Sequence, residues 1–258
     1  MNDRFSDSNR DTEFDDLPEF RLLAGLLAEN PELLDTLPPN PEGIAPASLF
    51  VPTGYEPNYA YPLVVWLKGP DGCALDFQHL MPVISDRNYL GLEIDATEAI
   101  GNNLDLLNEP TDSDAPTPLM ALEFLVEWKV RQLRQTYNIH TERVFLAGFG
   151  DGGTLALQLG LARPEWFAGI VAVSSRFPAT RSTLRRFRDL RKKRVLLSCG
   201  SQSRRVTPTQ TLETSRLLHS AGMRVCTRVH DAGHQITRSM LLEIDRWIMQ
   251  EILQPQPV

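Results

Sequence analysis

One stretch, residues 143–157, constrains the fold of this chain more than any other. It reads RVFLAGFGDGGTLAL: a short apolar run, a glycine-rich corner, and then small residues that favour a helix. This pattern predicts a buried strand that turns sharply into a helix. Glycines are needed at such a corner because the two elements nearly touch and the turning residue adopts a strained backbone conformation.

The size and composition of the chain suit one domain with a full core. Its 258 residues are 42% apolar and 23% charged. No apolar run reaches membrane-spanning length and the first residues are polar and acidic, so we expect a cytoplasmic protein without a membrane span. The three scattered cysteines imply no disulfide framework and are expected to pack as small apolar residues.

Charge is unevenly distributed along the chain. The net charge of −7 argues against nucleic-acid binding, although residues 181–194 contain eight arginines and lysines and residues 1–16 are acidic. We interpret these two segments as a solvated helix face and a disordered tail. The alternative is that the basic segment 181–194 binds an anionic partner or the acidic tail itself.

Strand-like and helix-like segments alternate along the chain. Seven segments have the apolar composition of strands: 47–51, 62–67, 89–94, 143–149, 167–174, 193–198 and 223–229. Three have strong helical periodicity: 118–135, 209–220 and 236–253. This alternation predicts an α/β fold: a doubly wound, mostly parallel sheet with helices on both faces. A long surface loop is expected over 96–118.

The sequence also suggests three regions along the chain. Residues 1–16 form the disordered acidic tail. Residues 17–45 combine one or two short amphipathic helices with a proline-rich linker. The α/β domain then occupies 46–258.

With its elements in this order, the chain resembles the carboxylesterase/phospholipase branch of the α/β-hydrolases, which includes the acyl-protein thioesterases. Four stretches show the resemblance: 64–69, 143–153, 199–203 and 231–236. They follow the family's order of nucleophile, acid and base, and the glycine-rich corner corresponds to its nucleophile elbow. The resemblance implies the α/β-hydrolase fold for residues 46–258.

The resemblance also implies where the family's catalytic groups fall. Its members use a serine nucleophile, a histidine base and an acid that orients the histidine. The base position falls on His234, the nucleophile position on Gly150 and the acid position on Ser203. Glycine offers no nucleophile, and a serine cannot stabilise an imidazolium as a carboxylate does.

The two oxyanion-hole positions are altered as well. One donor corresponds to the N–H of Asp151, whose carboxylate would lie close to the developing anion. The other falls on Pro70, after the Lys68-Gly69 pair, and proline has no N–H to donate. We therefore expect a pseudoenzyme: an esterase-like scaffold that binds a small acyl or ester-like ligand, or a partner, without serine-dependent hydrolysis.

Two alternatives remain open. The first is an ester hydrolase or thioesterase with weak or rewired activity, using His234 and a non-standard nucleophile such as Asp151 or Ser175. The second is that 181–194 and the helices of 17–37 form an interaction surface for a protein partner, or that the chain forms a homodimer. No metal-ligand spacing and no nucleotide-binding loop is present, so we predict no metal and no cofactor.

Overall fold

The computed structural model describes residues 48–70, 76–101, 117–178 and 187–253, with only the backbone of residues 187 and 188. All of these residues belong to one compact unit, Gly43–Val258. The predicted acidic tail and helical extension lie outside the described residues. Among the helices that the structure describes, none is long and apolar enough to cross a membrane.

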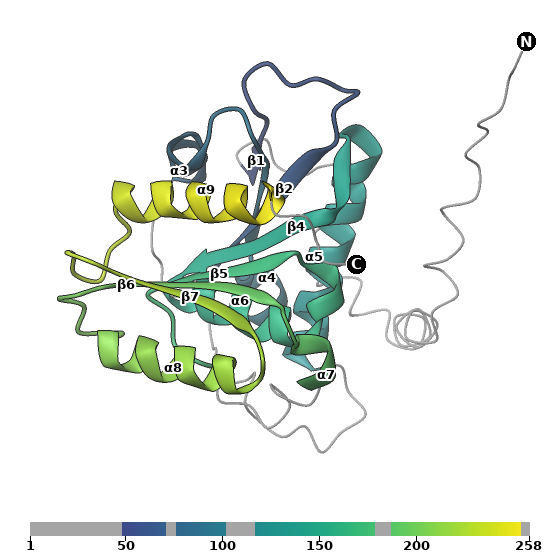
Figure 1. Cartoon of the computed structure of the whole chain (residues 1–258). Coiled ribbons are helices and arrows are strands. Elements are labelled where there is room, and N and C mark those ends of the chain that lie inside the picture. The colour runs from purple at the N-terminus through teal and green to yellow at the C-terminus, as the bar shows by residue number, and fades with distance from the viewer. Residues whose placement is uncertain (1–47, 71–75, 102–116, 179–186, 254–258) are drawn as a thin grey trace, which may run out of the picture. The chain divides into compact units, whose positions relative to one another are not determined.

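A seven-stranded sheet forms the centre of the described unit, in the order β1-β3-β2-β4-β5-β6-β7 (Figure 1). Its strands are β1 (Leu49–Phe50), β2 (Tyr61–Lys68), β3 (Leu90–Asp95), β4 (Ile139–Phe149), β5 (Gly169–Val173), β6 (Arg194–Gly200) and β7 (Arg224–His230). Only the edge strand β1 runs antiparallel to its neighbour, and every other pair is parallel. The predicted doubly wound, mostly parallel sheet is confirmed.

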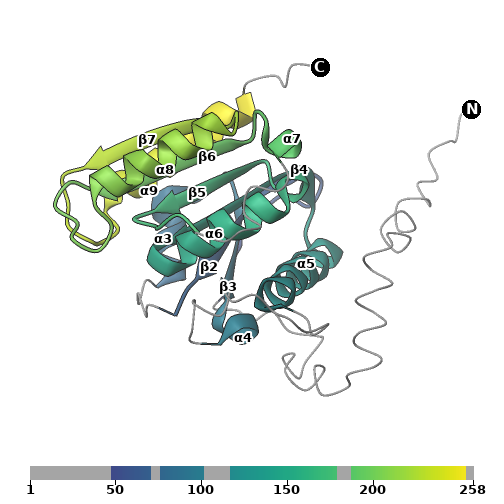
Figure 2. The ribbon, with the colours of Figure 1, turned by 90° about the horizontal axis from the view of Figure 1, so that it is seen from below.

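Helices cover both faces of the sheet. Figure 1 shows α3 (Phe77–Ile84) and α9 (Arg238–Leu253) together on one face. On the opposite face, which Figure 2 presents to the viewer, lie α5 (Pro118–Thr136), α6 (Gly150–Ala162) and α8 (Pro208–Ser220). Three short helical segments complete the described elements: α4 (Thr97–Ile100), η3 (Pro164–Trp166) and α7 (Phe187–Leu190).

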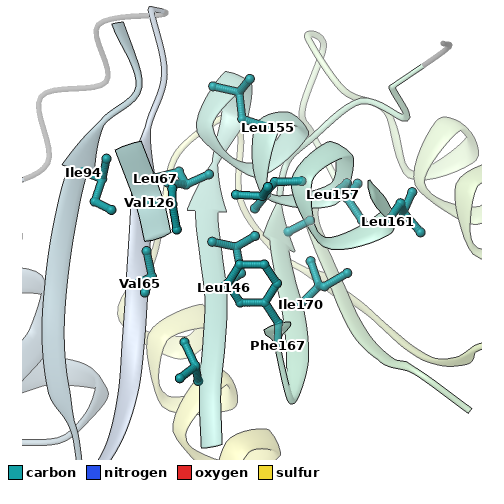
Figure 3. Packing of buried hydrophobic residues seen from close by; sticks show 14 of the residues in the cluster. Val65, Leu67, Ile94, Val126, Leu146, Leu155, Leu157, Leu161, Phe167 and Ile170 are labelled. Carbon is teal, nitrogen blue, oxygen red and sulfur yellow. The ribbon is translucent and has the colours of Figure 1, made fainter. Parts of the chain in front are cut away.

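The hydrophobic core consists of one cluster on each face of the sheet. Side chains of β2 alternate between them: Val65 and Leu67 join the cluster with α5 and α6, whereas Val64 and Trp66 join the cluster with α3 and α9. Figure 3 shows part of the first cluster, with Leu146 of β4 at its centre. Burial on both faces explains why the strand segments read as continuous apolar runs.

Two helices lie where the sequence predicted none. Helix α3 has only eight residues and contains Pro82, so it lacks a clear helical signature. It forms because Asp76 caps its first turn, accepting from the Gln78 N–H at 2.9 Å, and because Phe77 and Met81 are buried. Helix α4 falls within the loop predicted over 96–118, and most of that loop lies outside the described residues.

Candidate functional site

The glycine-rich corner forms a tight strand–turn–helix elbow at the carboxyl end of β4. Gly150 is the first residue of α6 and follows Phe149, the last residue of β4. Its φ of +58° lies in the left-handed region that favours glycine. The chain thereby reverses direction within one residue, as the sequence predicts.

Close contacts explain the other glycines of the elbow. A Cβ atom on Gly148 would lie 2.6 Å from the backbone N of Gly153, and one on Gly152 would overlap the carbonyl oxygen of Leu67 in β2. A Cβ on Gly153 would overlap the hydroxyl oxygen of Ser175. Helix α6 therefore packs directly against β2, β4 and the end of β5.

The loop after β2 reaches the same elbow. A Cβ on Gly69 would lie 2.5 Å from the backbone N of Gly152 and 2.8 Å from the Cβ of Asp151. Pro70 follows Gly69 directly in the chain, so both predicted oxyanion-hole segments meet at the start of α6. Lys68, the residue before Gly69, is ion-paired with Asp95 through Nζ and Oδ2 at 3.1 Å.

The ion pair between Lys68 and Asp95 shifts the pKa of both side chains. The hydrogen bond from the ammonium group to Asp95, together with the charge of that carboxylate, raises the pKa of Lys68. Burial raises the pKa of Asp95, but hydrogen bonds from Thr97 and Lys68 outweigh this effect and hold that pKa below its usual value. Lys68 is therefore a residue paired with Asp95, directly before Gly69 in the loop that reaches the elbow.

His234 and Ser203 lie on neighbouring loops that face the elbow. The Oγ of Ser203 is 3.4 Å from Nδ1 of His234 and also accepts from the Val206 N–H at 3.3 Å. The His234 ring is stacked obliquely on Phe149, with the ring centroids 5.0 Å apart. Because Phe149 immediately precedes Gly150, the structure brings the predicted nucleophile, acid and base positions together.

Several bonds join the loop after β6 to the loop that contains His234. The Ser201 N–H donates to the carbonyl of His230 at 2.7 Å, and the Gln202 N–H donates to the carbonyl of Ala232 at 2.9 Å. The Gln202 side-chain amide also donates to Oδ1 of Asp231 at 2.9 Å. The two loops therefore form one unit, and the position of His234 depends on both.

An ion pair connects this unit to the elbow. Nη2 of Arg205 lies 3.4 Å from Oδ2 of Asp151, the residue after Gly150. The Asp151 side chain is 13% exposed, whereas that of Arg205 is 40% exposed. The carboxylate therefore lies at the N-terminus of α6, within ion-pairing distance of a guanidinium group. Sequence reasoning missed this contact because 54 positions separate the partners.

Three other side chains that could act as nucleophiles, Ser174, Ser175 and Cys199, are buried. Ser175 is buried and its hydroxyl donates to the carbonyl of Val173 at 2.9 Å. Ser174 is fully buried with a φ of +50°. Cys199 is also fully buried, and burial raises the pKa of its thiol, although a hydrogen bond with Thr211 partly offsets this. The packing predicted for Cys199 is confirmed.

The described end of the basic segment 181–194 is only partly solvated: Arg191 and Lys192 are exposed, whereas Lys193 and Arg194 are half-buried at the start of the predicted strand 193–198. Helix α7 ends at Leu190, and Arg194 begins β6. The ammonium of Lys193 donates to the carbonyl of Phe167 at 2.5 Å, and burial lowers its pKa. Arg194 is ion-paired with Glu251. Residues 179–186, which include Arg181, Arg185 and Arg186, lie outside the described residues.

No group of three histidine, cysteine or acidic side chains that could hold a metal ion occurs within the described residues. The polar groups that the structure describes around the elbow include the His234 imidazole, the Asp151–Arg205 ion pair, several buried serine hydroxyls and the N–H groups of the first turn of α6.

The mostly parallel sheet, its covering helices and the elbow together define an α/β-hydrolase fold. Comparison with known families then gives a finer assignment. The chain belongs to the phospholipase/carboxylesterase family, whose sequence model matches residues 112–252, more than half of the 258 residues. The matched range includes Gly150, Ser203 and His234 but not Gly69 or Pro70.

Comparison with known proteins finds a relative of similar sequence over part of this chain. NocK of Nocardia uniformis subsp. tsuyamanensis, a protein named as an esterase, is 27% identical over 124 residues, which cover 48% of this chain and 36% of NocK. The chain thus matches about a third of the length of that relative.

Two solved structures share the fold. SOBER1 of Arabidopsis thaliana has 20% identity and a TM-score of 0.56, covering 75% of this chain and all of that one. A phospholipase/carboxylesterase from Dyadobacter fermentans DSM 18053 has 19% identity and a TM-score of 0.57, covering 81% of this chain and all of that one. At this level of identity the likeness shows the fold alone.

Proposed function

We propose that this chain is an esterase-like α/β-hydrolase domain that binds a small acyl or ester-like ligand without serine-dependent hydrolysis. The observation that carries the proposal is Gly150, which heads α6 with a φ of +58° in the segment where the family elbow holds its nucleophilic serine. A glycine at this point leaves no atom that could form an acyl-enzyme. Loss of the serine alone lowers the rate on the order of 10⁶-fold in a well-studied serine hydrolase.

The surroundings of His234 support the same conclusion. Its Nδ1 faces the hydroxyl of Ser203 at 3.4 Å. In the serine hydrolases a carboxylate at this position orients the histidine and stabilises its protonated form. A neutral hydroxyl at a long hydrogen-bonding distance stabilises the protonated histidine poorly.

The two segments that correspond to the family's oxyanion hole also support the proposed lack of serine-dependent hydrolysis. Pro70 has no N–H, so the loop after Gly69 lacks the donor that the family supplies at this point. At the other segment, the Asp151 carboxylate is held at the start of α6 by Arg205. Negative charge there opposes the development of a second negative charge on a substrate oxygen.

The alternative is a hydrolase with rewired activity through His234 and another nucleophile. The contacts of the candidates disfavour it. Asp151 is ion-paired with Arg205, and the Ser175 hydroxyl is buried and donates to a backbone carbonyl. Ser203 is only 4% exposed and its Oγ already accepts from Val206. Each would have to break these contacts before it could attack an ester.

Hydrolysis of p-nitrophenyl butyrate by the purified chain tests the proposal. We expect the parent chain and His234→Ala to match the rate in buffer, because no nucleophile is present for His234 to activate. The Gly150→Ser variant is the positive control. Gly150 directly follows Phe149, whose ring contacts that of His234, so we expect a serine at position 150 to react with a fluorophosphonate probe, and Gly150→Ser/His234→Ala to react far less. Turnover by the parent chain that His234→Ala abolishes would establish the rewired hydrolase instead.

A further inference from the structure

Strand β7 forms one edge of the sheet, and within the described residues no further strand pairs with its outer side. The strand order places it last, beside β6 alone (Figure 2). Its seven residues, Arg224–His230, pair with β6 without a register shift. By contrast, β1 at the other edge of the sheet has only two residues. The long edge is therefore the one that can accept another strand.

Backbone contacts show which groups of β7 point outward. The Arg224 N–H donates to the carbonyl of the residue just before β6 at 2.8 Å, and the His230 carbonyl accepts from the N–H of the residue just after β6 at 2.7 Å. Both ends of β7 thus direct these groups toward β6. Because successive residues of a strand direct them to opposite sides, the N–H and C=O groups of Val225, Thr227 and Val229 point away from β6.

This edge lacks most of the features that protect exposed strands from pairing. Proline, lysine, a bulge or a very short strand are common protective features. Strand β7 reads RVCTRVH, with no proline, glycine or lysine. Arg228 is neutralised by Glu243 of α9, to which its Nε donates at 2.9 Å, and its Nη1 donates to the Thr227 carbonyl at 3.2 Å. A carbonyl has two lone pairs, so that of Thr227 can also accept from a partner strand.

We propose that two copies of this chain associate through antiparallel pairing of their β7 strands, centred on Thr227. In this register Thr227 lies opposite Thr227 of the second copy, and Val225 lies opposite Val229. All of these residues have outward-pointing groups, so each pair can exchange two N–H···O=C hydrogen bonds. Moving the centre by one residue in either direction would place one outward residue of each strand opposite a residue beyond β7.

The side chains at the edge complement each other in the same register. Thr227 faces α8, because its hydroxyl donates to that of Ser215 at 2.9 Å, and Val225 packs against the core cluster on this face. Val229 follows on the same face by the alternation of the strand and is 49% exposed. Pairing covers it with Val225 of the second copy, and such β-branched pairs stabilise sheets. Because the edge complements itself, it fits a second copy of this chain.

Sedimentation velocity of the full chain across the micromolar range tests this inference. We expect a reversible dimer with twice the chain mass of 29.1 kDa. Val229→Lys introduces a charge where two copies meet, so it should weaken association at least about tenfold. Val51→Lys is the matched control, because Val51 is also an exposed valine and directly follows β1 at the other edge of the sheet. It should leave association unchanged.

Cysteine cross-linking tests the register. Thr227→Cys places two thiols opposite each other in a hydrogen-bonded pair, where the Cα atoms are about 5.5 Å apart, a separation that a disulfide spans. Mild oxidation should then give a covalent dimer that a reductant dissolves. Val229→Cys should cross-link far less alone than in combination with Val225→Cys, because these two positions face each other. The parent chain controls for the native cysteines.

A parent chain that stays monomeric across this range would overturn the inference, whether the edge is free or covered by another segment of the same chain. So would a dimer that Val229→Lys leaves intact, or one that Thr227→Cys does not cross-link, because the copies would then meet elsewhere or in another register. Far-UV circular dichroism shows whether Val229→Lys is folded. If it is not, the cross-linking of Thr227→Cys decides.

Discussion

Single glycines determine how closely the loops of the candidate site approach each other. Gly200 ends β6, and a Cβ at this position would lie 2.8 Å from the carbonyl carbon of Ala232 and would overlap the carbonyl oxygens of Ala232 and Gly233. These atoms belong to the loop that positions His234, two residues further along. The contact between the two loops is therefore as close as a glycine allows.

At this residue we predict that Gly200→Ala destabilises the protein by about 1–3 kcal/mol, the usual cost of overpacking. The loop of His234 must move to accommodate the methyl group. Urea denaturation measures the loss, and the NMR shifts of the His234 ring report the displacement. Gly233→Ala is the control, because a Cβ there meets nothing within 4 Å. A neutral Gly200→Ala variant would show that the loops are less tightly packed than the structure indicates.

At the scale of the elements, the N-terminal cap of α8 also stabilises one end of a loop of the candidate site. Its first residue, Pro208, follows the loop of Ser203 and Arg205 by three positions. Thr207 and Gln210 form a capping box: the Gln210 N–H donates to the Thr207 hydroxyl at 3.3 Å, and the Thr207 N–H donates to the Gln210 side chain at 2.9 Å. The cap fixes the end of the loop as well as the start of the helix.

We expect Thr207→Ala to lower the free energy of unfolding by about 1 kcal/mol, the typical cost of losing an N-cap side chain. Thr209→Ala, an exposed position in the same first turn, should be close to neutral. Chemical denaturation of both variants gives the comparison. Faster hydrogen exchange at Val206 in Thr207→Ala would show that the loop loosens with the helix, whereas equal losses in the two variants would contradict a capping role.

Helix α3 is an element that the sequence did not predict, because tertiary packing stabilises it. Its eight residues include Pro82, and its stability comes from burial of Phe77 and Met81 against the face that α9 also covers. Local propensity carries little of this information. By contrast, α5 has 19 residues with an apolar stripe, and the sequence predicted its range within one residue at its C-terminal end.

At the scale of the whole molecule, His230 couples stability to pH. It ends β7, and its Nδ1 lies 3.3 Å from the hydroxyl of Ser239 in the first turn of α9. Burial lowers the pKa of His230, Glu243 partly offsets this, and Arg228 adds to it. The folded state therefore binds a proton at His230 less readily than the unfolded state, so stability from this group is present above the usual histidine pKa and is lost as the pH falls below it.

We predict that His230→Gln reduces the loss of unfolding free energy between pH 7.5 and pH 5.5. Urea denaturation at the two pH values gives the difference for the parent chain and the variant. His219→Gln, on exposed α8 surface, controls for the removal of an imidazole. An unchanged pH dependence in His230→Gln would show that His230 titrates alike in the folded and unfolded states.

Most of the architecture was accessible from the sequence alone. Continuous apolar runs such as that of β2 predict strands buried on both faces, and their alternation with helices predicts a doubly wound sheet. The glycines of the elbow predict the close approach of α6 to the sheet, because no other residue fits there. Periodicity acts between neighbouring residues, and steric exclusion restricts the crowded positions to glycine, so both leave a pattern that can be read in the sequence.

The contacts that define the chemistry of the site were decided only by the tertiary structure. The Asp151–Arg205 ion pair joins residues 54 positions apart, and the Ser203–His234 contact joins residues 31 positions apart. The sequence could indicate, through family resemblance, that these segments meet, but not which polar atoms pair. Parallel strands bring distant loops to one edge of the sheet, and the geometry at that edge depends on the packing of every helix around it.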